Sequence, residues 1–149
     1  MSAFDTPSVP ADFAFFEPLR VRWAEVDMQG VVFNPNYLVY ADVAMSEYMR
    51  AAGFAGVDGL ASLGIDMFAA GASLDFRASA RFNDDLRLGA RIERFGRTSF
   101  QPRVAVFRGD ELLADVGLTY VCAAPDEPRR SVPVPEAFIA ACRALDGAA

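Results

Sequence analysis

The 149-residue chain contains no histidine, and all 14 of its basic residues are arginine, so lysine is absent as well. Without histidine, the sequence cannot form a Ser-His-Asp triad, a Cys-His pair or an imidazole metal ligand. Without lysine, it has no Schiff-base nucleophile and no phosphate-binding lysine of the Walker type. Acid–base or nucleophilic chemistry therefore falls to a carboxylate, a tyrosine or a cysteine.

Cysteine and positive charge are also scarce. Cys122 and Cys142 have neither metal-ligand spacing nor a disulfide-rich context, so we expect buried free thiols, no metal site and no cofactor. The net charge of −6 argues against nucleic acid or an anionic membrane as a partner. No apolar run approaches the roughly 18 residues of a membrane span, and no secretory leader is recognisable. The composition predicts a cytoplasmic protein.

One stretch near the N-terminus combines a strand, a turn and a long helix in immediate succession. Apolar and charged residues alternate over residues 19–23, which predicts a strand with one buried face. Asp27 and Gly30 mark the turn that follows. Asn34 precedes Pro35, a pairing that predicts Asn34 as the N-cap of a helix.

The predicted helix offers hydrogen-bond donors at its start. An apolar stripe with three- and four-residue spacing runs along it, and Gly53 supplies the C-terminal stop. Pro35 has no N–H, so the expected free donors are those of Asn34, Asn36 and Tyr37. With the positive end of the helix macrodipole, these donors attract an oxyanion or a polarised carbonyl. Asp27 lies one short loop upstream, so a carboxylate and a polarising helix end could face one bound carbonyl.

These residues resemble the 4-hydroxybenzoyl-CoA thioesterase family, a branch of the hotdog-fold acyl-CoA thioesterases. The resemblance lies in Asp27-x-x-Gly30, then Val31-Val32-Phe33, then Asn34-Pro35-Asn36-Tyr37 opening a long helix. It implies that Asp27 is the catalytic carboxylate, as general base or nucleophile, and that the Asn34 N–H binds the thioester oxygen. It also implies an acyl-CoA substrate, and a homodimer or homotetramer whose sites form between edge-paired subunits.

The remaining sequence predicts an α+β fold with one domain. Strands, a turn at Gly109-Asp110 and a C-terminal helix are indicated by alternation and helical spacing. With the first strand they make about five antiparallel strands, and the resemblance implies a hotdog fold, a curved sheet wrapped around one long helix. We expect a loose N-terminal arm over residues 1–14 and one domain over residues 15–149. The predicted ranges are strands at 72–82, 86–93, 98–107 and 112–120, a short helix and loop within 54–71, and a helix at 137–145.

Several further residues are candidates for substrate binding. Gly30 belongs to the resembled motif, and Phe33, Tyr37 and Phe68 could line an acyl pocket, although Tyr37 alternatively packs in the core. Three arginines near a predicted strand end could pair with CoA phosphates, or form a solvated face; they are Arg91, Arg94 and Arg97. Another hotdog subgroup places its catalytic acid inside the helix, where this chain has Asp42 and Glu47; we expect solvated or interface carboxylates there.

Two function classes stay open from the sequence alone. The first is a thioesterase acting on aromatic or short-to-medium acyl-CoA. The second is a non-catalytic protein that binds acyl-CoA or an acyl carrier on the same scaffold. A hotdog hydratase or dehydratase is disfavoured because those enzymes typically depend on histidine, which the chain lacks. Release of free thiol from acyl-CoA separates the first two classes.

Overall fold

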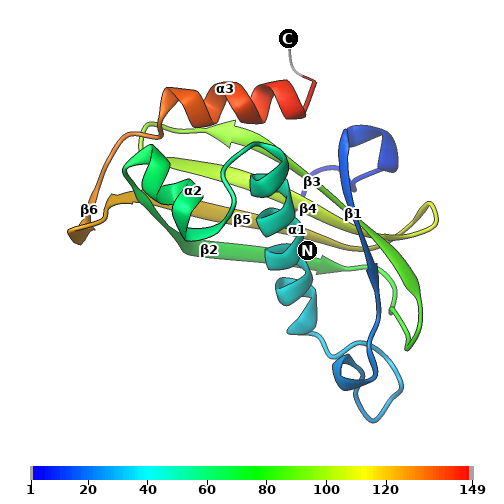
Figure 1. The fold of residues 1–149 in the computed structure, drawn as a ribbon. Helices are drawn as coiled ribbons and strands as arrows, with labels where there is room; N and C mark the ends of the chain where they lie inside the picture. The colour runs from blue at the N-terminus through cyan, green and yellow to red at the C-terminus, as the bar shows by residue number, and fades with distance from the viewer. Residues whose placement is uncertain (1, 148–149) are drawn as a thin grey trace.

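The computed structural model describes residues 2–147, which form one curved antiparallel sheet with three α-helices (Figure 1). The strand order is β1-β3-β4-β5-β2, and β6 pairs with β5. None of the described helices is long and apolar enough to cross a membrane. The elements are β1 (Phe15–Arg20), α1 (Asn36–Ala51), α2 (Gly56–Leu63), β2 (Asp66–Phe76), β3 (Asp85–Phe95), β4 (Ser99–Arg108), β5 (Glu111–Ala124), β6 (Glu127–Ser131) and α3 (Glu136–Leu145).

Helix α1 lies against one face of the sheet and supplies much of the main core (Figure 1). Its buried residues follow helical spacing, as the sequence predicted, and three of them are tyrosines. Each tyrosine hydroxyl has a hydrogen-bond partner, which offsets the cost of burying it. The α+β class and the antiparallel sheet around one long helix are thereby confirmed. The buried residues of α1 are Tyr37, Tyr40, Ala41, Ala44, Met45 and Tyr48.

The predicted boundaries of two strands are wrong, and β2 also begins at Asp66, within the range predicted as a helix and loop. The first strand ends at Arg20, and Trp23–Glu25 form a 3₁₀ turn instead, because the Glu25 carboxylate accepts the Arg22 N–H at 2.8 Å. The strand expected at residues 72–82 is β2, which ends at Phe76 although the alternation continues. Beyond it, the N–H groups of Arg77 and Ala78 both donate to one carbonyl and interrupt the ladder.

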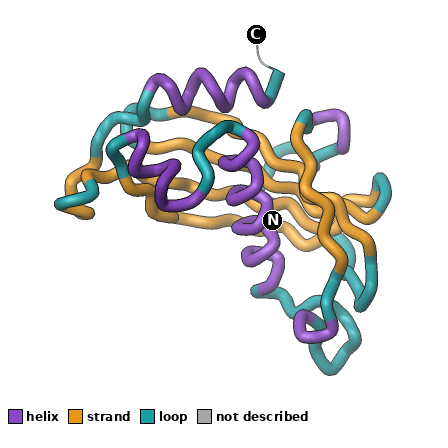
Figure 2. The backbone as a smooth tube through the Cα atoms, viewed as in Figure 1, coloured by secondary structure: helices purple, strands orange, loops and turns teal. Residues whose placement is uncertain are grey.

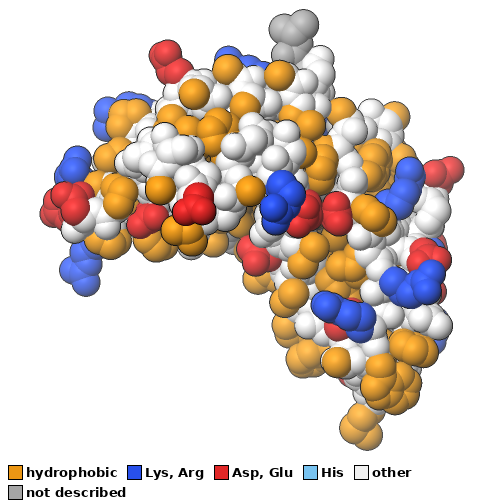
Figure 3. Space-filling view, in the orientation of Figure 1, with side chains coloured by type: hydrophobic (Ala, Val, Ile, Leu, Met, Phe, Trp, Pro, Cys, Tyr) orange, Lys and Arg blue, Asp and Glu red, His pale blue; other side chains and the backbone are white. Residues whose placement is uncertain are grey.

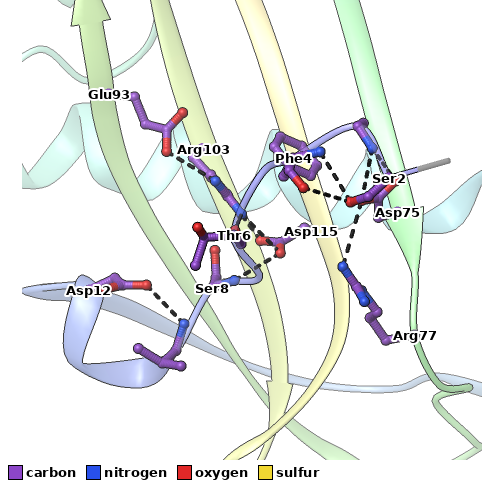
Figure 4. A network of polar contacts seen from close by, with 12 residues as sticks. Ser2, Phe4, Thr6, Ser8, Asp12, Asp75, Arg77, Glu93, Arg103 and Asp115 are labelled. Atoms are coloured by element: carbon purple, nitrogen blue, oxygen red, sulfur yellow. Dashed lines mark hydrogen bonds and ion pairs between the residues drawn. The ribbon is translucent and has the colours of Figure 1, made fainter.

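The N-terminal arm crosses the sheet face opposite α1 and is held there by specific contacts (Figure 4). The Ser8 N–H donates to the Asp115 carboxylate at 3.0 Å, and Arg103 donates to the Thr6 carbonyl at 2.7 Å. Arg103 and Asp115 form a buried ion pair at 3.1 Å, and the Arg103 guanidinium covers the ring of Phe4. The sequence predicted a loose arm and gave no indication of these contacts.

Strand β2 forms an open edge of the sheet. Among the described residues it pairs only with β5, and its middle part, residues 69–73, is small and exposed. A row of unpaired backbone groups on a long strand favours pairing with another chain.

Candidate active site

A long loop between β1 and α1 projects from the sheet and carries Asp27 (Figure 2). The Asp27 N–H donates to the Val31 carbonyl at 2.9 Å, and the Gly30 N–H donates to the Asp27 carbonyl at 3.0 Å. Gly30 adopts a φ of +76°, a conformation that favours glycine. Oδ1 of Asp27 accepts the Gln29 N–H at 2.8 Å, whereas Oδ2 has no hydrogen-bond partner among the described residues. The loop therefore fixes the carboxylate and leaves one oxygen free.

Backbone contacts tie this loop to the start of α1. Val26 and Val32 form a β-bridge, and the Phe33 N–H donates to the Glu25 carbonyl at 2.9 Å. The same carbonyl accepts the side-chain amide of Asn36, the first residue of α1, at 2.9 Å. The position of Asp27 is thus coupled to the helix start by a short network and not by chain connectivity alone.

Glu25, two residues before Asp27, is buried and fully engaged. One carboxylate oxygen accepts hydrogen bonds from the Arg22 backbone N–H and, at 3.1 Å, from the Tyr40 hydroxyl. The second oxygen pairs with the Arg22 guanidinium at 2.5 Å. Burial alone would raise the pKa of Glu25, but the hydrogen bonds from Arg22 and Tyr40 hold it below its usual value. Glu25 therefore anchors the loop, and neither of its oxygens is free for chemistry.

The start of α1 retains one of the three donors predicted there. The Asn36 N–H donates to the Phe33 carbonyl at 2.8 Å and the Tyr37 N–H donates to the Asn34 carbonyl at 3.2 Å, so both are occupied. The Asn34 N–H has no acceptor among the described residues. The prediction of Asn34 as a side-chain N-cap is wrong, because Pro35 takes that position and no side chain caps the helix. A turn closed by backbone bonds replaces the cap.

An open cleft brings Asp27 together with Phe33 and Asn36. Phe33 is half exposed at its wall. The cleft is also lined by Ala24, Val26 and Met28, so it is mostly apolar around the carboxylate. Gly30 shapes the Asp27 turn but is not part of the lining. The cleft places the Asp27 carboxylate beside Asn36, the first residue of α1, and the positive end of a helix suits a polarised carbonyl. Asn34 is not among the lining residues of this cleft.

Two predicted pocket residues lie elsewhere. Tyr37 is buried in the core, and its hydroxyl accepts the Ala80 N–H at 2.9 Å, so it packs and positions the chain before β3. Phe68 is exposed on β2, where it pairs with Val121 of β5, and it is not part of the Asp27 cleft.

The predicted arginines lie at the opposite end of β3 from the Asp27 loop (Figure 1). The residues before β3 contact that loop through a bridge between Val31 and Arg81, whereas the far end of β3 lies beside α3. Arg91 pairs with Glu93 at 2.9 Å, and it shares a cleft with Arg94 and three carboxylates. Arg97 is exposed beyond that cleft. One protomer therefore does not bring these arginines to Asp27.

The cysteines and tyrosines offer no competing nucleophile in this cleft. Both cysteines are buried and free, as predicted. Burial raises the pKa of Cys122 to about 11 and that of Cys142 to about 12, so both are protonated at neutral pH. Burial also raises the pKa values of Tyr40 and Tyr48.

Exposed hydrophobic side chains surround the tip of the Asp27 loop. Trp23 is 74% exposed and packs edge-on against Phe82, with ring centroids 5.3 Å apart, and Met28 is fully exposed. Figure 3 shows hydrophobic side chains gathered at the end of the molecule where Figure 1 has this loop. This patch was not predictable from the sequence, because isolated hydrophobic residues in a loop carry no periodicity.

Residues 29–114, more than half of the chain, match the family model of the thioesterase superfamily, and the chain belongs to that superfamily. It is a thioester hydrolase. A putative esterase of Aquifex aeolicus is 26% identical over 95 residues, which cover 64% of this chain and 73% of the relative.

Solved structures support the fold. A thioesterase from Thermus thermophilus, complexed with coenzyme A and Zn, is 25% identical with a TM-score of 0.78, over 93% of this chain and 98% of that one. A variant of 4-hydroxybenzoyl-CoA thioesterase, bound to 4-hydroxybenzoyl-CoA, is 24% identical with a TM-score of 0.77, over 86% and 97% of the two chains. These similarities confirm the hotdog fold.

Proposed function

We propose that this protein hydrolyses acyl-CoA thioesters, with Asp27 as the catalytic carboxylate and the Asn34 N–H as the oxyanion donor. The observation that carries the proposal is that one loop leading into α1 holds both an Asp27 Oδ2 and an Asn34 N–H without a partner among the described residues. The family match begins at residue 29, so it does not include Asp27, and this role rests on geometry and on the resembled motif.

The mechanism needs little besides these two groups. Asp27 either removes a proton from the attacking water or attacks the thioester carbon itself and forms an anhydride. In both routes negative charge develops on the carbonyl oxygen, where the Asn34 N–H and the positive end of α1 stabilise it. A thiolate is a stable leaving group, with a thiol pKa of about 8.5, so expulsion of CoA does not require the acid that histidine would supply.

The comparisons support CoA as the carrier. The Thermus thermophilus thioesterase holds coenzyme A, and the 4-hydroxybenzoyl-CoA thioesterase, in a variant with one aspartate replaced by asparagine, holds its acyl-CoA. A non-catalytic binding protein is the weaker alternative, because this chain combines membership of a hydrolase superfamily with a free carboxylate oxygen at a helix start.

The site requires a second subunit in this proposal. The three arginines lie at the end of β3 away from the Asp27 loop within one protomer, so in this proposal they reach its substrate from a partner. Pairing through the open edge of β2 would produce a homodimer, and further association a homotetramer. Arg94 and Arg97 are then the better candidates for the CoA phosphates, because Arg91 already pairs with Glu93.

Replacement of Asp27 by asparagine tests the assignment. Asparagine retains an acceptor for the Gln29 N–H, so the loop should keep its shape, while the basic and nucleophilic oxygen is lost. We expect kcat for acyl-CoA hydrolysis, measured as thiol release, to fall at least about a hundredfold. The matched control is Asp85→Asn, which removes an exposed carboxylate paired with Arg20. A folded Asp27→Asn enzyme with a near-normal rate would refute the role.

A single-turnover experiment in water enriched in oxygen-18 distinguishes the two routes. If Asp27 forms an anhydride that water opens at the aspartyl carbon, the heavy oxygen enters the protein carboxylate. If Asp27 acts as a general base, the heavy oxygen appears only in the released acid. Mass spectrometry of the peptide that contains Asp27 reads out the difference.

A further inference from the structure

Beside the face that packs on the sheet, helix α1 carries a stripe of apolar residues that also includes Asp42 and Ser46 and meets the buried face at Met45. Its residues recur at three- and four-residue spacing, so they form one stripe along the helix. Leu38 is 41% exposed and Val39 is 48% exposed, so neither side chain is fully covered within a single protomer. The stripe consists of Pro35, Leu38, Val39, Asp42, Met45, Ser46 and Met49.

This stripe forms one wall of a groove that begins at Pro35, beside the start of α1. In its first part, the opposite wall is the small-residue segment 69–72 of β2, next to Pro35 and Leu38. In its second part, the groove passes between α1 and α2 and ends in a cleft of about 440 Å³. Asp42 and Tyr120 line both parts, so the groove is continuous.

The inner end of the groove is suited to a flexible apolar group. It is lined by Met45, Met49 and Met67, which adapt to irregular apolar shapes. Its floor includes Tyr120 stacked on Phe100, with ring centroids 5.5 Å apart and planes at 15°. Charged groups from Asp42 and Arg50 lie at the lining but the remaining side chains are apolar or small.

The length of the groove exceeds what an aromatic acyl group fills. From Pro35 to Met49 the helix rises by roughly 21 Å at about 1.5 Å per residue. The groove starts on one side of the helix opening, at Pro35, whereas the Asp27 cleft lies on the other side, at Phe33 and Asn36. A thioester bound between them would extend its CoA arm one way and its acyl chain the other.

We infer that the groove binds the unbranched fatty acyl chain of the substrate, so the enzyme prefers medium-chain fatty acyl-CoA to benzoyl-CoA or short acyl-CoA. This inference rests on the proposed function. It narrows the aromatic or short-to-medium acyl groups expected from the sequence to the medium-chain part of that range. The inner cleft lies between elements of one protomer, with Met45 and Phe100 almost fully buried at its base. A partner paired along β2 would meet the outer part of the groove, where residues 69–72 form one wall.

The chain-length profile of hydrolysis tests the inference. Each additional methylene removed from water should raise kcat/KM by up to about fourfold until the groove is full. We expect kcat/KM to increase from butyryl-CoA through octanoyl-CoA to lauroyl-CoA, and benzoyl-CoA to be a poorer substrate than lauroyl-CoA. A profile without dependence on chain length, in an enzyme that hydrolyses every member, would overturn the inference and leave the proposed function intact.

Substitutions at Met49 locate the chain. Met49→Trp fills the inner cleft, and it should lower the ratio of kcat/KM for lauroyl-CoA to that for butyryl-CoA by on the order of tenfold. Met49→Ala lengthens the cleft, and it should raise the ratio of kcat/KM for palmitoyl-CoA to that for lauroyl-CoA. Val9→Trp adds the same ring at an exposed position outside the groove and should leave both ratios unchanged.

Binding of non-hydrolysable thioethers separates this inference from the activity. By calorimetry, S-dodecyl-CoA should bind the wild-type protein at least about tenfold more tightly than S-butyl-CoA, and Met49→Trp should remove most of that difference. If the thioethers show these affinities but no acyl-CoA is hydrolysed, the proposed function is wrong, whereas binding of the acyl chain in the groove is supported. Met49→Trp could instead change the molecular mass of the protein in light scattering and leave the dependence of kcat/KM on acyl-chain length unchanged. In that case the groove belongs to the subunit contact and the inference is wrong.

Discussion

At the scale of single residues, the surroundings of three carboxylates separate their roles. Asp27 has one oxygen held by the Gln29 N–H and one free. Glu25 has both oxygens engaged by Arg22 and Tyr40. Asp115 is fully buried in an ion pair. Only the first arrangement leaves a basic oxygen that a substrate can reach, and the other two stabilise the structure around it.

A proline substitution can remove the Asn34 backbone donor. Asn34→Pro deletes the N–H, and we expect kcat for acyl-CoA hydrolysis to fall by about a hundred- to a thousandfold, as for loss of one oxyanion donor. Asn34→Ala keeps the N–H, and because the Asn34 side chain makes no hydrogen bond within residues 2–147, it should stay within a few fold of wild type. Circular dichroism checks the fold of both. Equal losses in the two variants would assign the effect to the side chain.

The depressed pKa of Glu25 predicts pH-dependent stability. A carboxyl group whose pKa is lower in the folded than in the unfolded state stabilises the fold above about pH 4.3, and that stabilisation is lost as the pH falls through the folded-state pKa. Glu25→Gln should therefore lower the free energy of unfolding by about 1–3 kcal/mol at pH 7 and by much less near pH 3. Urea unfolding at fixed protein concentration measures both values. A difference that does not change with pH would contradict the prediction.

Structural features that depend only on residues close in the sequence were predictable. The Asp27 and Gly30 turn follows from short-range chemistry, and so does the glycine stop at Gly53, which has a φ of +94°. The availability of the Asn36 and Tyr37 N–H groups was not predictable, because the acceptors at Phe33 and Asn34 appear only when the loop closes on itself.

At the scale of elements, the best-predicted strands are those that pair with a neighbouring strand on each side. Strands β3 and β4 match their predicted ranges closely. Strand β4 is buried over residues 102–107, because the N-terminal arm covers its second face. The boundary of β2 was missed because the alternating pattern runs on past Phe76 while the backbone leaves the ladder. Strand β6 was missed because its residues are all exposed and carry no alternation.

The N-terminal arm depends on the buried pair of Arg103 and Asp115. Asp115→Asn leaves Arg103 buried without its main counter-charge and weakens the hold on the Ser8 N–H, so it should lower the free energy of unfolding by about 3 kcal/mol or more. Limited proteolysis should then cut within residues 2–12 faster than in wild type. The control, Asp110→Asn, removes an exposed partner of Arg87 and should cost under about 1 kcal/mol.

At the scale of the whole molecule, the open edge of β2 and the separation of Asp27 from Phe68 and the arginines point to assembly. The mass of one chain is 16.1 kDa, and we expect light scattering to give at least twice that value under assay conditions. A fully active monomer would contradict this prediction. The sequence could not specify which edge is open, because strand order is set by long-range pairing.

A charged substitution on the edge of β2 tests whether thioesterase activity depends on subunit association. Ser73→Arg places a large cation on the exposed part of β2, away from Asp27 and Asn34. We expect a shift toward the monomer and a matching loss of thioesterase activity, both reversed in part at high protein concentration. Ser131→Arg, on the exposed strand β6, is the matched control and should change neither property. A monomeric Ser73→Arg enzyme with normal turnover would show that one subunit suffices.

The solvent-facing Trp23 is the only tryptophan of the chain, and it lies four residues before Asp27. Because the indole is 74% exposed, we expect its emission to report an aqueous environment in the folded protein and to shift little on denaturation, so far-ultraviolet circular dichroism is the better probe of unfolding. The same exposure makes the indole an intrinsic optical reporter for whatever covers the loop. A blue shift on adding acyl-CoA or on raising protein concentration would record ligand or subunit contact at that loop without any introduced label.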